Sequence, residues 1–370
     1  MKIAHIGMKG LPSRGGADRV VEKIALCLAT SHQITVYCSK RDTPSNAVLD
    51  GVTLIRMPYL TGKHVHMTSV DLLAALHAVL WGKYDLIHLH HIEACFVLPL
   101  LKLRFKVVST SHGRITEGNK WGRLAAMVMR AMEVPYAVMS DSATSVSEPQ
   151  ARDLARRFRR VVTHVPNGVD PKPRIDEDAA RTLLRQYEVE PDSYLVFAAG
   201  RMIPLKGAHL ILEAFLRLKS SCRLVLIGDG SALPEYSARL RSGGNGRAVF
   251  VPFVESQAAL LGLIRLSRLF VFPSMDEAMS MMLLEAASVG APIVCSDIPP
   301  NRDVLSDAAV YFKSGNAGDL ADKLSWALEH RAEMSALGER AQARVRRYFA
   351  WDSIANRYEA LYQEVIANRA

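Results

Sequence analysis

The 370 residues are 49% hydrophobic and 22% charged, which is typical of a soluble chain with two domains of about 150–200 residues each. No apolar run approaches the ~18–20 residues that cross a bilayer, and the start shows no signal-peptide pattern. The five scattered cysteines suit neither a disulfide framework nor a zinc site, so we expect a cytoplasmic protein, either free or peripheral on the inner face of the cytoplasmic membrane.

The net charge of +9 is concentrated in the first half of the chain. Residues 1–168 hold 22 Lys and Arg against 12 Asp and Glu, whereas the remainder holds 24 against 25. An anionic partner, either a phospholipid surface or a diphosphate-linked acceptor, explains this excess as well as a solvated basic face does. Nucleic acid explains it less well, because no zinc finger, helix-turn-helix or aromatic-basic motif occurs.

Short β-branched apolar runs alternate with helical patterns from one end of the chain to the other. The runs are apolar throughout, which is typical of parallel strands that are covered on both faces. The expected strands are KIAHIG, QITVYC, TLIRMP, DLIHLH, KVVSTSH, AVMSDSATSVS and VVTHVP, then YLVFAAG, RLVLIGDG, AVFVPF, LFVFPS, PIVCSD and AVYF. Helices are expected over 19–29, 69–80, 206–219, 256–266 and 317–330. This alternation predicts two doubly wound α/β domains, with a boundary near the VPNGVDPKP stretch at 165–173.

The first candidate site is the glycine-rich segment GMKGLPSRGGADRVVEKIA, between the first strand and the first helix. Gly15 and Gly16 would let the backbone approach a ligand at the helix N-terminus. The spacing does not match the GxGxxG dinucleotide fingerprint, and there is no Walker A motif. A plain glycine turn is the alternative interpretation.

The second candidate is FAAGRMIPLKGAHL, where Arg201 follows a buried strand and Lys206 precedes a helix. Two cations beside helix amides could bind a diphosphate and neutralise the charge that develops on a leaving nucleotide. Surface cations are common, so this segment alone is weak support.

The third candidate is MDEAMSMMLLEAASVG, which carries Glu277 in a loop and Glu285 in the second turn of a helix that starts near Ser280. Both carboxylates would then lie at the carboxyl ends of the strands, where open α/β sheets bind ligands. Paired acceptors there suit sugar hydroxyls, although acids near a helix N-terminus also arise without a ligand.

These segments, in this order, resemble the retaining GT-B glycosyltransferases of the fourth sequence family, the bacterial "glycosyl transferases group 1" type. The resemblance covers nearly the whole chain and includes DLIHLHH, STSHG, SVSE, VPNGVD, GRMIPLKG, LVLIGDG and FAWDSIANRYEALY. It implies two Rossmann-like domains facing a central cleft. Residues 1–168 would bind the acceptor, 169–350 would bind the nucleotide sugar, and 351–370 would form a helix that packs back toward the first domain.

The resemblance also implies roles for individual residues. Arg201 and Lys206 would bind the donor diphosphate, Glu285 the ribose hydroxyls, and Glu277 the donor sugar. His112 would lie beside the reacting carbon, although a single His after a strand is more often structural. Catalytic roles would thus fall to His112, Glu277, Arg201 and Lys206. The donor-binding set would comprise Gly15, Gly16, Arg201, Lys206, Glu277, Ala278, Met279, Ser280 and Glu285.

Three features complete the expectations. Where the family usually has EGFG, this chain has Glu277-Ala278-Met279-Ser280, so the donor sugar is not predicted. The pair Asp176 and Asp178 is interpreted as the acidic start of a helix, and the resemblance implies no metal and no cofactor. His88, His90 and His91 are interpreted as strand-end residues and not as metal ligands.

The resemblance predicts transfer from a nucleoside diphosphate sugar, a UDP-sugar or a GDP-sugar, to a glycan or lipid-linked glycan during cell-surface polysaccharide synthesis. The segment 120–135, with Trp121 and several methionines and arginines, would suit a lipid-linked acceptor at the membrane surface, but it fits a buried core helix slightly better. Two other functions stay open: an epimerase of nucleoside diphosphate sugars with the same architecture, and a non-catalytic sugar-nucleotide-binding subunit.

Overall fold

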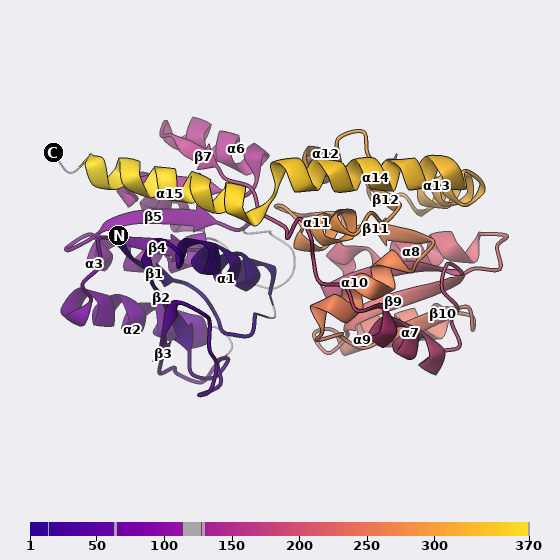
Figure 1. The fold of residues 1–370 in the computed structure, drawn as a ribbon, viewed down its shortest axis with the longest axis horizontal. Helices are drawn as coiled ribbons and strands as arrows, with labels where there is room; N and C mark the ends of the chain where they lie inside the picture. The colour runs from indigo at the N-terminus through magenta and orange to yellow at the C-terminus, as the bar shows by residue number, and fades with distance from the viewer. Residues whose placement is uncertain (14, 63–64, 114–126, 128–129, 369–370) are drawn as a thin grey trace. The chain divides into compact units, whose positions relative to one another are not determined.

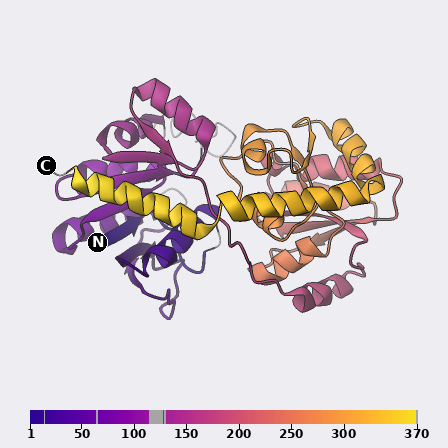
Figure 2. The same cartoon turned by 45° about the horizontal axis from the view of Figure 1, so that its top comes forward.

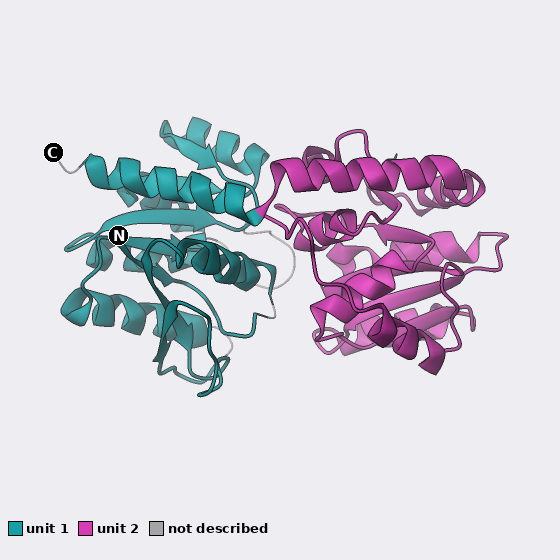
Figure 3. Cartoon of the chain, in the orientation of Figure 1, with its two compact units in different colours: residues 1–167, 351–370 teal, residues 168–350 magenta. Residues whose placement is uncertain are grey.

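The structure is a computed structural model that describes residues 1–13, 15–62, 65–113, 127 and 130–368. The chain divides into two compact units (Figure 3). Unit 1 comprises residues 1–167 together with 351–370, and unit 2 comprises residues 168–350. The boundary therefore falls at Gly168, within the VPNGVDPKP stretch, and the C-terminal helix belongs to unit 1.

Unit 1 is built on a parallel sheet of seven strands in the order β3-β2-β1-β4-β5-β6-β7 (Figure 1). Its strands are β1 (Lys2–Ile6), β2 (Gln33–Ser39), β3 (Val52–Met57), β4 (Leu86–His90), β5 (Lys106–Ser111), β6 (Ser142–Ser145) and β7 (Val162–His164). Its helices are α1 (Gly16–Leu28), α2 (Val65–Trp81), η1 (Ile92–Val97), α3 (Leu98–Leu101), α5 (Glu133–Met139), α6 (Glu148–Phe158) and α15 (Trp351–Ala367). The strand order reverses between β1 and β4, which makes the carboxyl ends of these strands the expected ligand edge.

Unit 2 repeats the plan with six parallel strands in the order β10-β9-β8-β11-β12-β13. Its strands are β8 (Tyr194–Arg201), β9 (Arg223–Asp229), β10 (Ala248–Val251), β11 (Leu269–Phe272), β12 (Ile293–Ser296) and β13 (Val310–Phe312). Its helices are α7 (Glu177–Gln186), η2 (Pro204–Lys206), α8 (Ala208–Leu216), α9 (Pro234–Gly243), α10 (Gln257–Arg265), α11 (Met281–Ser288), α12 (Pro299–Leu305), α13 (Ala317–Glu329) and α14 (Arg331–Tyr348). Here the order reverses between β8 and β11, the two strands that precede the expected donor residues.

The central strands are buried along their length, as their unbroken apolar sequences predict. All four residues of β11 and all five of β4 are buried, and helices cover both sheet faces. Gly7 directly follows β1, its φ of +104° is accessible to glycine, and a Cβ there would lie 2.3 Å from the His90 carbonyl oxygen. The close approach of β1 and β4 therefore depends on glycine at this position.

Helix α15 packs against α1 and β5 of unit 1 (Figure 2). Its tyrosines Tyr358 and Tyr362 are fully buried, and the Tyr362 hydroxyl lies 2.6 Å from Nδ1 of His88. The amphipathic pattern of the C-terminal segment thus supplies part of the core of unit 1.

One expected strand is wrong in its extent. AVMSDSATSVS is strand only over Ser142–Ser145, whereas Ala137–Met139 forms the end of helix α5. This short helix buries Tyr136 and Ala137 against the core, and so a buried helical face produced the same apolar run as a strand.

Within the described residues, no helix combines the length and apolar character that spanning a bilayer requires.

Candidate functional site

The carboxyl end of β8 carries the first two expected site residues. Arg201 is the last residue of the strand and is exposed, and Lys206 ends the single turn η2 five residues later. Gly207 follows with a φ of +76°, and a Cβ there would lie 2.3 Å from the carbonyl oxygen of Pro273. Glycine at this position lets the β8 segment approach the residues that follow β11.

Lys206 and Glu277 meet at this edge of the sheet. The Lys206 Nζ lies 2.6 Å from Oε1 of Glu277, which also accepts a hydrogen bond from the Ser274 hydroxyl at 2.7 Å. The Glu277 side chain is 10% exposed and that of Lys206 is 29% exposed. The structure therefore joins one expected phosphate ligand to one expected sugar ligand, through loops that are 71 residues apart in sequence.

Helix α11 begins directly after the loop that carries Glu277, Ala278 and Met279. Its N-cap is Ser280, whose hydroxyl accepts a hydrogen bond from the Leu283 amide, and this explains why the helix begins at Met281. Glu285 lies in the second turn, is 2% exposed, and accepts a hydrogen bond from Nε2 of Gln257 at 2.9 Å. The Glu285 carboxylate is thus held by α10.

A pocket that the three candidate motifs did not include lies at the neighbouring edge of the same sheet. It encloses about 410 Å³ between the loop after β9 and the residues after β10. Its lining includes Gly228, Asp229, Gly230, Arg241 and Phe253. The sequence pattern that could have indicated this pocket is LVLIGDG, because the end of this strand carries three of the lining residues.

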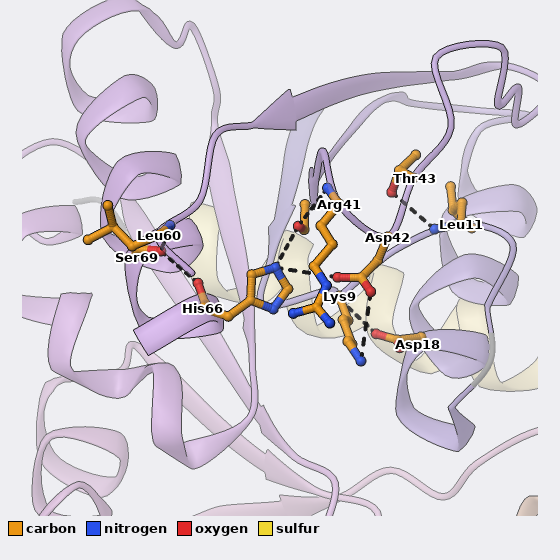
Figure 4. Close-up of polar contacts among 10 residues, drawn as sticks. Lys9, Leu11, Asp18, Arg41, Asp42, Thr43, Leu60, His66 and Ser69 are labelled. Atoms are coloured by element: carbon orange, nitrogen blue, oxygen red, sulfur yellow. Dashed lines mark hydrogen bonds and ion pairs between the residues drawn. The ribbon is translucent and has the colours of Figure 1, made fainter. Parts of the chain in front are cut away.

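In unit 1, Gly15 and Gly16 lie at the start of α1, as their position in the glycine-rich segment predicts. Gly15 is the N-cap, Gly16 is the first helical residue, and both are exposed. Asp18, in the first turn, accepts a hydrogen bond from the Lys9 amide at 2.8 Å (Figure 4). Burial raises the pKa of the Asp18 carboxyl, against the lowering effect of the Lys9 amide. No sequence motif pointed to this acid.

A second polar cluster lies beside this loop (Figure 4). Asp42 forms an ion pair with Lys9 Nζ at 3.8 Å, and its carboxylate also lies 3.4 Å from His66 Nε2. His66 Nε2 lies 2.8 Å from the Ser39 hydroxyl, and burial lowers the pKa of His66. This cluster brings β1, β2 and α2 together at the carboxyl edge of the unit 1 sheet. Sequence reasoning missed it, because its members come from separate segments.

His112 directly follows β5 and is half-buried. The loop that carries it is fixed by Gln150, whose Nε2 donates to the Gly113 carbonyl at 3.2 Å and whose Oε1 accepts from the Ser111 hydroxyl at 3.0 Å. Burial holds the pKa of His112 well below its ordinary value, with a smaller contribution from His91. His112 is therefore a neutral imidazole at neutral pH.

His88 and His90 lie within β4 and are fully buried, whereas His91 follows the strand with a φ of +72°. His5 of β1 lies beside both, with its ring centroid 5.2 Å from that of His88 and 5.3 Å from that of His90. One nitrogen of each of His5, His88 and His90 falls within 4.8 Å of the others. Both nitrogens of His88 already have hydroxyl partners at 2.6 Å, from Tyr362 and Thr110. Binding a metal here would require His88 to give up one of these partners.

Asp176 and Asp178 belong to the start of a helix, as the sequence indicates. Asp176 is the N-cap of α7, and its carboxylate accepts a hydrogen bond from the Ala179 amide at 2.9 Å, while Asp178 lies in the first turn. Both carboxylates lie at the positive end of the helix dipole, where a negative charge stabilises the helix. The expected helix over 120–135 lies largely outside the described residues.

Two family models match the chain, one in each unit. Residues 14–172 match the model described as "Glycosyltransferase Family 4", and residues 180–344 match the model described as "Glycosyl transferases group 1". The second match contains Arg201, Lys206, Glu277 and Glu285.

Relatives and solved structures agree with these matches. The chain is 27% identical over 319 residues to a D-inositol 3-phosphate glycosyltransferase of Xylanimonas cellulosilytica, which covers 78% of this chain and 74% of that protein. It is 23% identical over 389 residues to a GDP-mannose:cellobiosyl-diphosphopolyprenol alpha-mannosyltransferase of Komagataeibacter xylinus, covering 99% and 94%. The sucrose-phosphate synthase of Thermosynechococcus elongatus superimposes with a TM-score of 0.82 at 19% identity over 100% of both chains. That likeness shows a shared fold.

Proposed function

Since the chain belongs to the GT-B glycosyltransferases, we propose that it transfers a hexose from a nucleoside diphosphate sugar to a hydroxyl of a lipid-linked saccharide, with retention of configuration. The observation that carries this proposal is the contact between Lys206 and Glu277 at the carboxyl edge of the unit 2 sheet. A cation and a carboxylate held side by side match the two ends of such a donor, the diphosphate and the sugar hydroxyls.

The donor diphosphate binds to Lys206 and Arg201. Negative charge grows on the leaving phosphate as the bond to the sugar breaks, so cations placed there stabilise the transition state more than the bound substrate. Positive side chains and the amides at the start of α11 supply this stabilisation without a metal ion or a cofactor. The amides of Ala278, Met279 and Ser280 lie in the loop that leads into that helix.

The nucleoside occupies the rest of the unit 2 edge. The pocket between the loops after β9 and β10 has about 410 Å³, enough for the base, and Glu285 accepts hydrogen bonds from the ribose hydroxyls. Glu285 is already held by Gln257, so its carboxylate needs little ordering when the ribose binds.

Unit 1 supplies His112 and the glycine loop. The resemblance assigns His112 a contact with the transferred sugar beside its reacting carbon, and it assigns Gly15 and Gly16 an approach to the donor phosphates or the acceptor. We carry both roles as part of the proposal. The retaining step is proposed as a front-face displacement, in which the leaving phosphate takes the proton of the acceptor hydroxyl.

The acceptor is proposed to bind unit 1, whose excess of basic residues suits a diphosphate-linked lipid at the cytoplasmic face of a membrane. The relative from Komagataeibacter xylinus is named for transfer to a cellobiosyl-diphosphopolyprenol, which is such an acceptor. A role in the assembly of a cell-surface polysaccharide follows from this acceptor class.

A donor screen tests the proposal. The purified chain is incubated with UDP-sugars and GDP-sugars, with and without a polyprenyl diphosphate saccharide, and the released nucleoside diphosphate and the products are measured. Acceptor-dependent release of nucleotide is expected. Conversion of the sugar without acceptor would indicate an epimerase, and binding without any turnover would indicate a non-catalytic subunit.

A further inference from the structure

Helix α2 is apolar on the side that faces solvent. From Val65 to Leu80 its exposed positions recur every three or four residues, so they lie along one side of the helix over about 22 Å. Apart from Thr68, the exposed residues of α2 are Val65, Leu72, Leu76, Leu80 and Trp81. The solvent side of a surface helix is normally charged or polar, as it is in α6, where the exposed residues are Arg152, Arg156 and Arg157. Helix α2 thus presents to solvent the kind of side chains that a helix normally buries.

The carboxylate that α2 does contain lies on its buried side. Asp71 is 6% exposed, and the helix has no Lys, Arg or Glu. Burial raises the pKa of Asp71 to about 8, with a smaller contribution from the Glu93 carboxylate. Asp71 is therefore mostly neutral at pH 7, and the exposed side of α2 carries no charge along its length.

Two neighbouring loops extend this apolar side at its ends. Leu60, which is 61% exposed, is held beside the first turns of α2, because its amide donates a hydrogen bond to the Ser69 hydroxyl at 2.9 Å (Figure 4). Leu103, which is 77% exposed, follows α3, and the next residue, Arg104, donates a hydrogen bond to the Val79 carbonyl in the last turns of α2. A contiguous apolar surface of this kind marks an interaction site. We call it the α2 stripe: Leu60, Val65, Leu72, Leu76, Leu80, Trp81 and Leu103.

Cations border the stripe at the end that carries Trp81. Lys83 directly follows α2, Arg104 follows Leu103, and both are exposed. The carboxylate of Asp85, two residues beyond Lys83, accepts a hydrogen bond from the Lys2 amide at 2.8 Å. Residues 1–168 as a whole hold 22 Lys and Arg against 12 Asp and Glu. An uncharged apolar stripe bordered by cations complements an anionic bilayer, in which the leucines enter the acyl boundary and the cations meet lipid phosphates.

We propose that the α2 stripe docks unit 1 on an anionic phospholipid bilayer, with α2 lying in the plane of the surface. Leu72, Leu76 and Leu80 then enter the boundary between headgroups and acyl chains, and Trp81 lies at headgroup level, where its indole N–H finds an acceptor. Because α2 follows β3, the stripe begins at the carboxyl edge of the unit 1 sheet, beside the cluster of Asp42 and His66 (Figure 4). Docking would hold that edge near the headgroups. Its use in presenting a lipid-linked acceptor rests on the proposed function, whereas docking itself does not.

The first test is vesicle sedimentation with the full chain, without donor or acceptor. The vesicles contain phosphatidylglycerol and phosphatidylcholine. We expect Leu72→Gln with Leu76→Gln to lower the partition coefficient of the chain at least about tenfold, because two leucine side chains no longer leave water. The matched control is Leu216→Gln with Leu233→Gln in unit 2. These two leucines are 40% and 42% exposed, against 43% and 37% for the α2 pair, and their replacement should leave the partition coefficient unchanged.

The second test locates Trp81 at the bilayer. Vesicles that carry brominated acyl chains should quench part of the tryptophan emission of the wild-type chain. Trp81→Phe should remove most of that quenching while the chain still sediments with the vesicles. Quenching that is the same in Trp81→Phe and wild type would place another tryptophan at the bilayer and overturn the proposal.

Two further outcomes would overturn it. Vesicle binding of the Leu72 and Leu76 variant equal to wild type, with equal melting temperatures, would show that the stripe does not meet lipid. A dimer of the wild-type chain in light scattering, absent in this variant, would show that a second copy covers the stripe. Failure of the proposed function gives a different result, in which the wild-type chain docks through the stripe but transfers no sugar.

Discussion

Lys206 Nζ lies 2.6 Å from Oε1 of Glu277. The Glu277 side chain is 10% exposed, and Lys206 compensates its charge through this ion pair. In the proposed donor complex, Lys206 would gain a second anionic partner and Glu277 would contact a sugar hydroxyl. The ion pair holds both side chains at the edge of the sheet.

This relationship makes a prediction that separates stability from catalysis. Lys206→Ala should lower the free energy of unfolding by about 1–3 kcal/mol, because it leaves a nearly buried carboxylate without its cation. The double variant Lys206→Ala with Glu277→Gln should recover most of that stability, since the amide carries no charge. Turnover should stay at least about a hundredfold below wild type in both. Urea unfolding and nucleotide release are the two measurements.

Recovery of turnover in the double variant would contradict the role of Lys206 as a diphosphate ligand. Lys206 would then act only through Glu277.

Arg201→Ala should lower kcat/KM for the donor by about 10²–10³-fold without a measurable loss of stability, because Arg201 is exposed at the end of β8. The matched control is Arg217→Ala, an exposed arginine of the same unit that pairs with Glu213 on α8. Steady-state kinetics and thermal melting of both variants decide the matter. Similar kinetics in the two variants would remove Arg201 from the site.

Activity should persist in excess EDTA, because Arg201, Lys206 and the helix amides are proposed to neutralise the leaving diphosphate. The measurement is nucleotide release before and after chelation, with added Mg²⁺ and Mn²⁺ as separate arms. Loss in EDTA with rescue by either ion would contradict the proposal. Asp176→Asn, which removes the acid that caps α7, would then show whether that acid pair holds the ion.

The buried histidines should make the fold sensitive to mild acid. The folded pKa of His5 is lowered to about 3, whereas in the unfolded chain it is about 6.5. Above pH 6.5 neither state binds the proton. As the pH falls below 6.5, only the unfolded chain takes it up, so stability is lost at up to about 1.4 kcal/mol per pH unit for each such group.

His5→Leu should therefore flatten the pH dependence of stability between about pH 6 and pH 4 relative to wild type. Urea unfolding at several pH values gives the two slopes. Parallel slopes would mean that His5 titrates in the folded state.

From the sequence, the strands and helices that carry the unit 2 site could be predicted well. The contacts between their side chains could not. LFVF is an unbroken apolar run, and Ser280 is a good N-cap residue, so the strand, loop and helix around Glu277 could be inferred locally. The partner of Glu277 could not, since Lys206 is 71 residues away and approaches only because β8 and β11 are neighbours in the sheet.

The cluster of His5, His88 and His90 in unit 1 was hidden for the same reason. Each histidine alone is consistent with a packed core residue, and DLIHLHH gives no sign that His5 is involved. Their contact depends on strand register, in which His5 of β1 lies opposite His88 of β4. Short helices such as α5 were misjudged because a few buried residues do not distinguish a helical face from a strand.

The basic surface of unit 1 gives the last prediction, that the chain binds anionic membranes through it. Of the arginines around the end of α6, Arg156 and Arg157 form ion pairs with Asp153. Arg159 and Arg160 follow the helix and are exposed, and no carboxylate among the described residues pairs with them. Reversing Arg159 and Arg160 to Glu should therefore weaken binding to anionic vesicles more than reversing Arg156 and Arg157. Vesicle sedimentation at low and moderate salt measures this.

The control is the pair Arg346 and Arg347, which is also exposed and lies in the last turn of α14 in unit 2. Reversing this pair changes the net charge equally, so it should leave vesicle binding near wild type if the membrane surface belongs to unit 1. Binding should also weaken steeply as salt rises, because exposed charges are screened over about 8–10 Å. Donor affinity, which we propose is set in unit 2, should not change when Arg159 and Arg160 are reversed. Vesicle binding that ignores lipid charge, or a loss of donor affinity equal to the loss of vesicle binding, would show that these arginines serve another site.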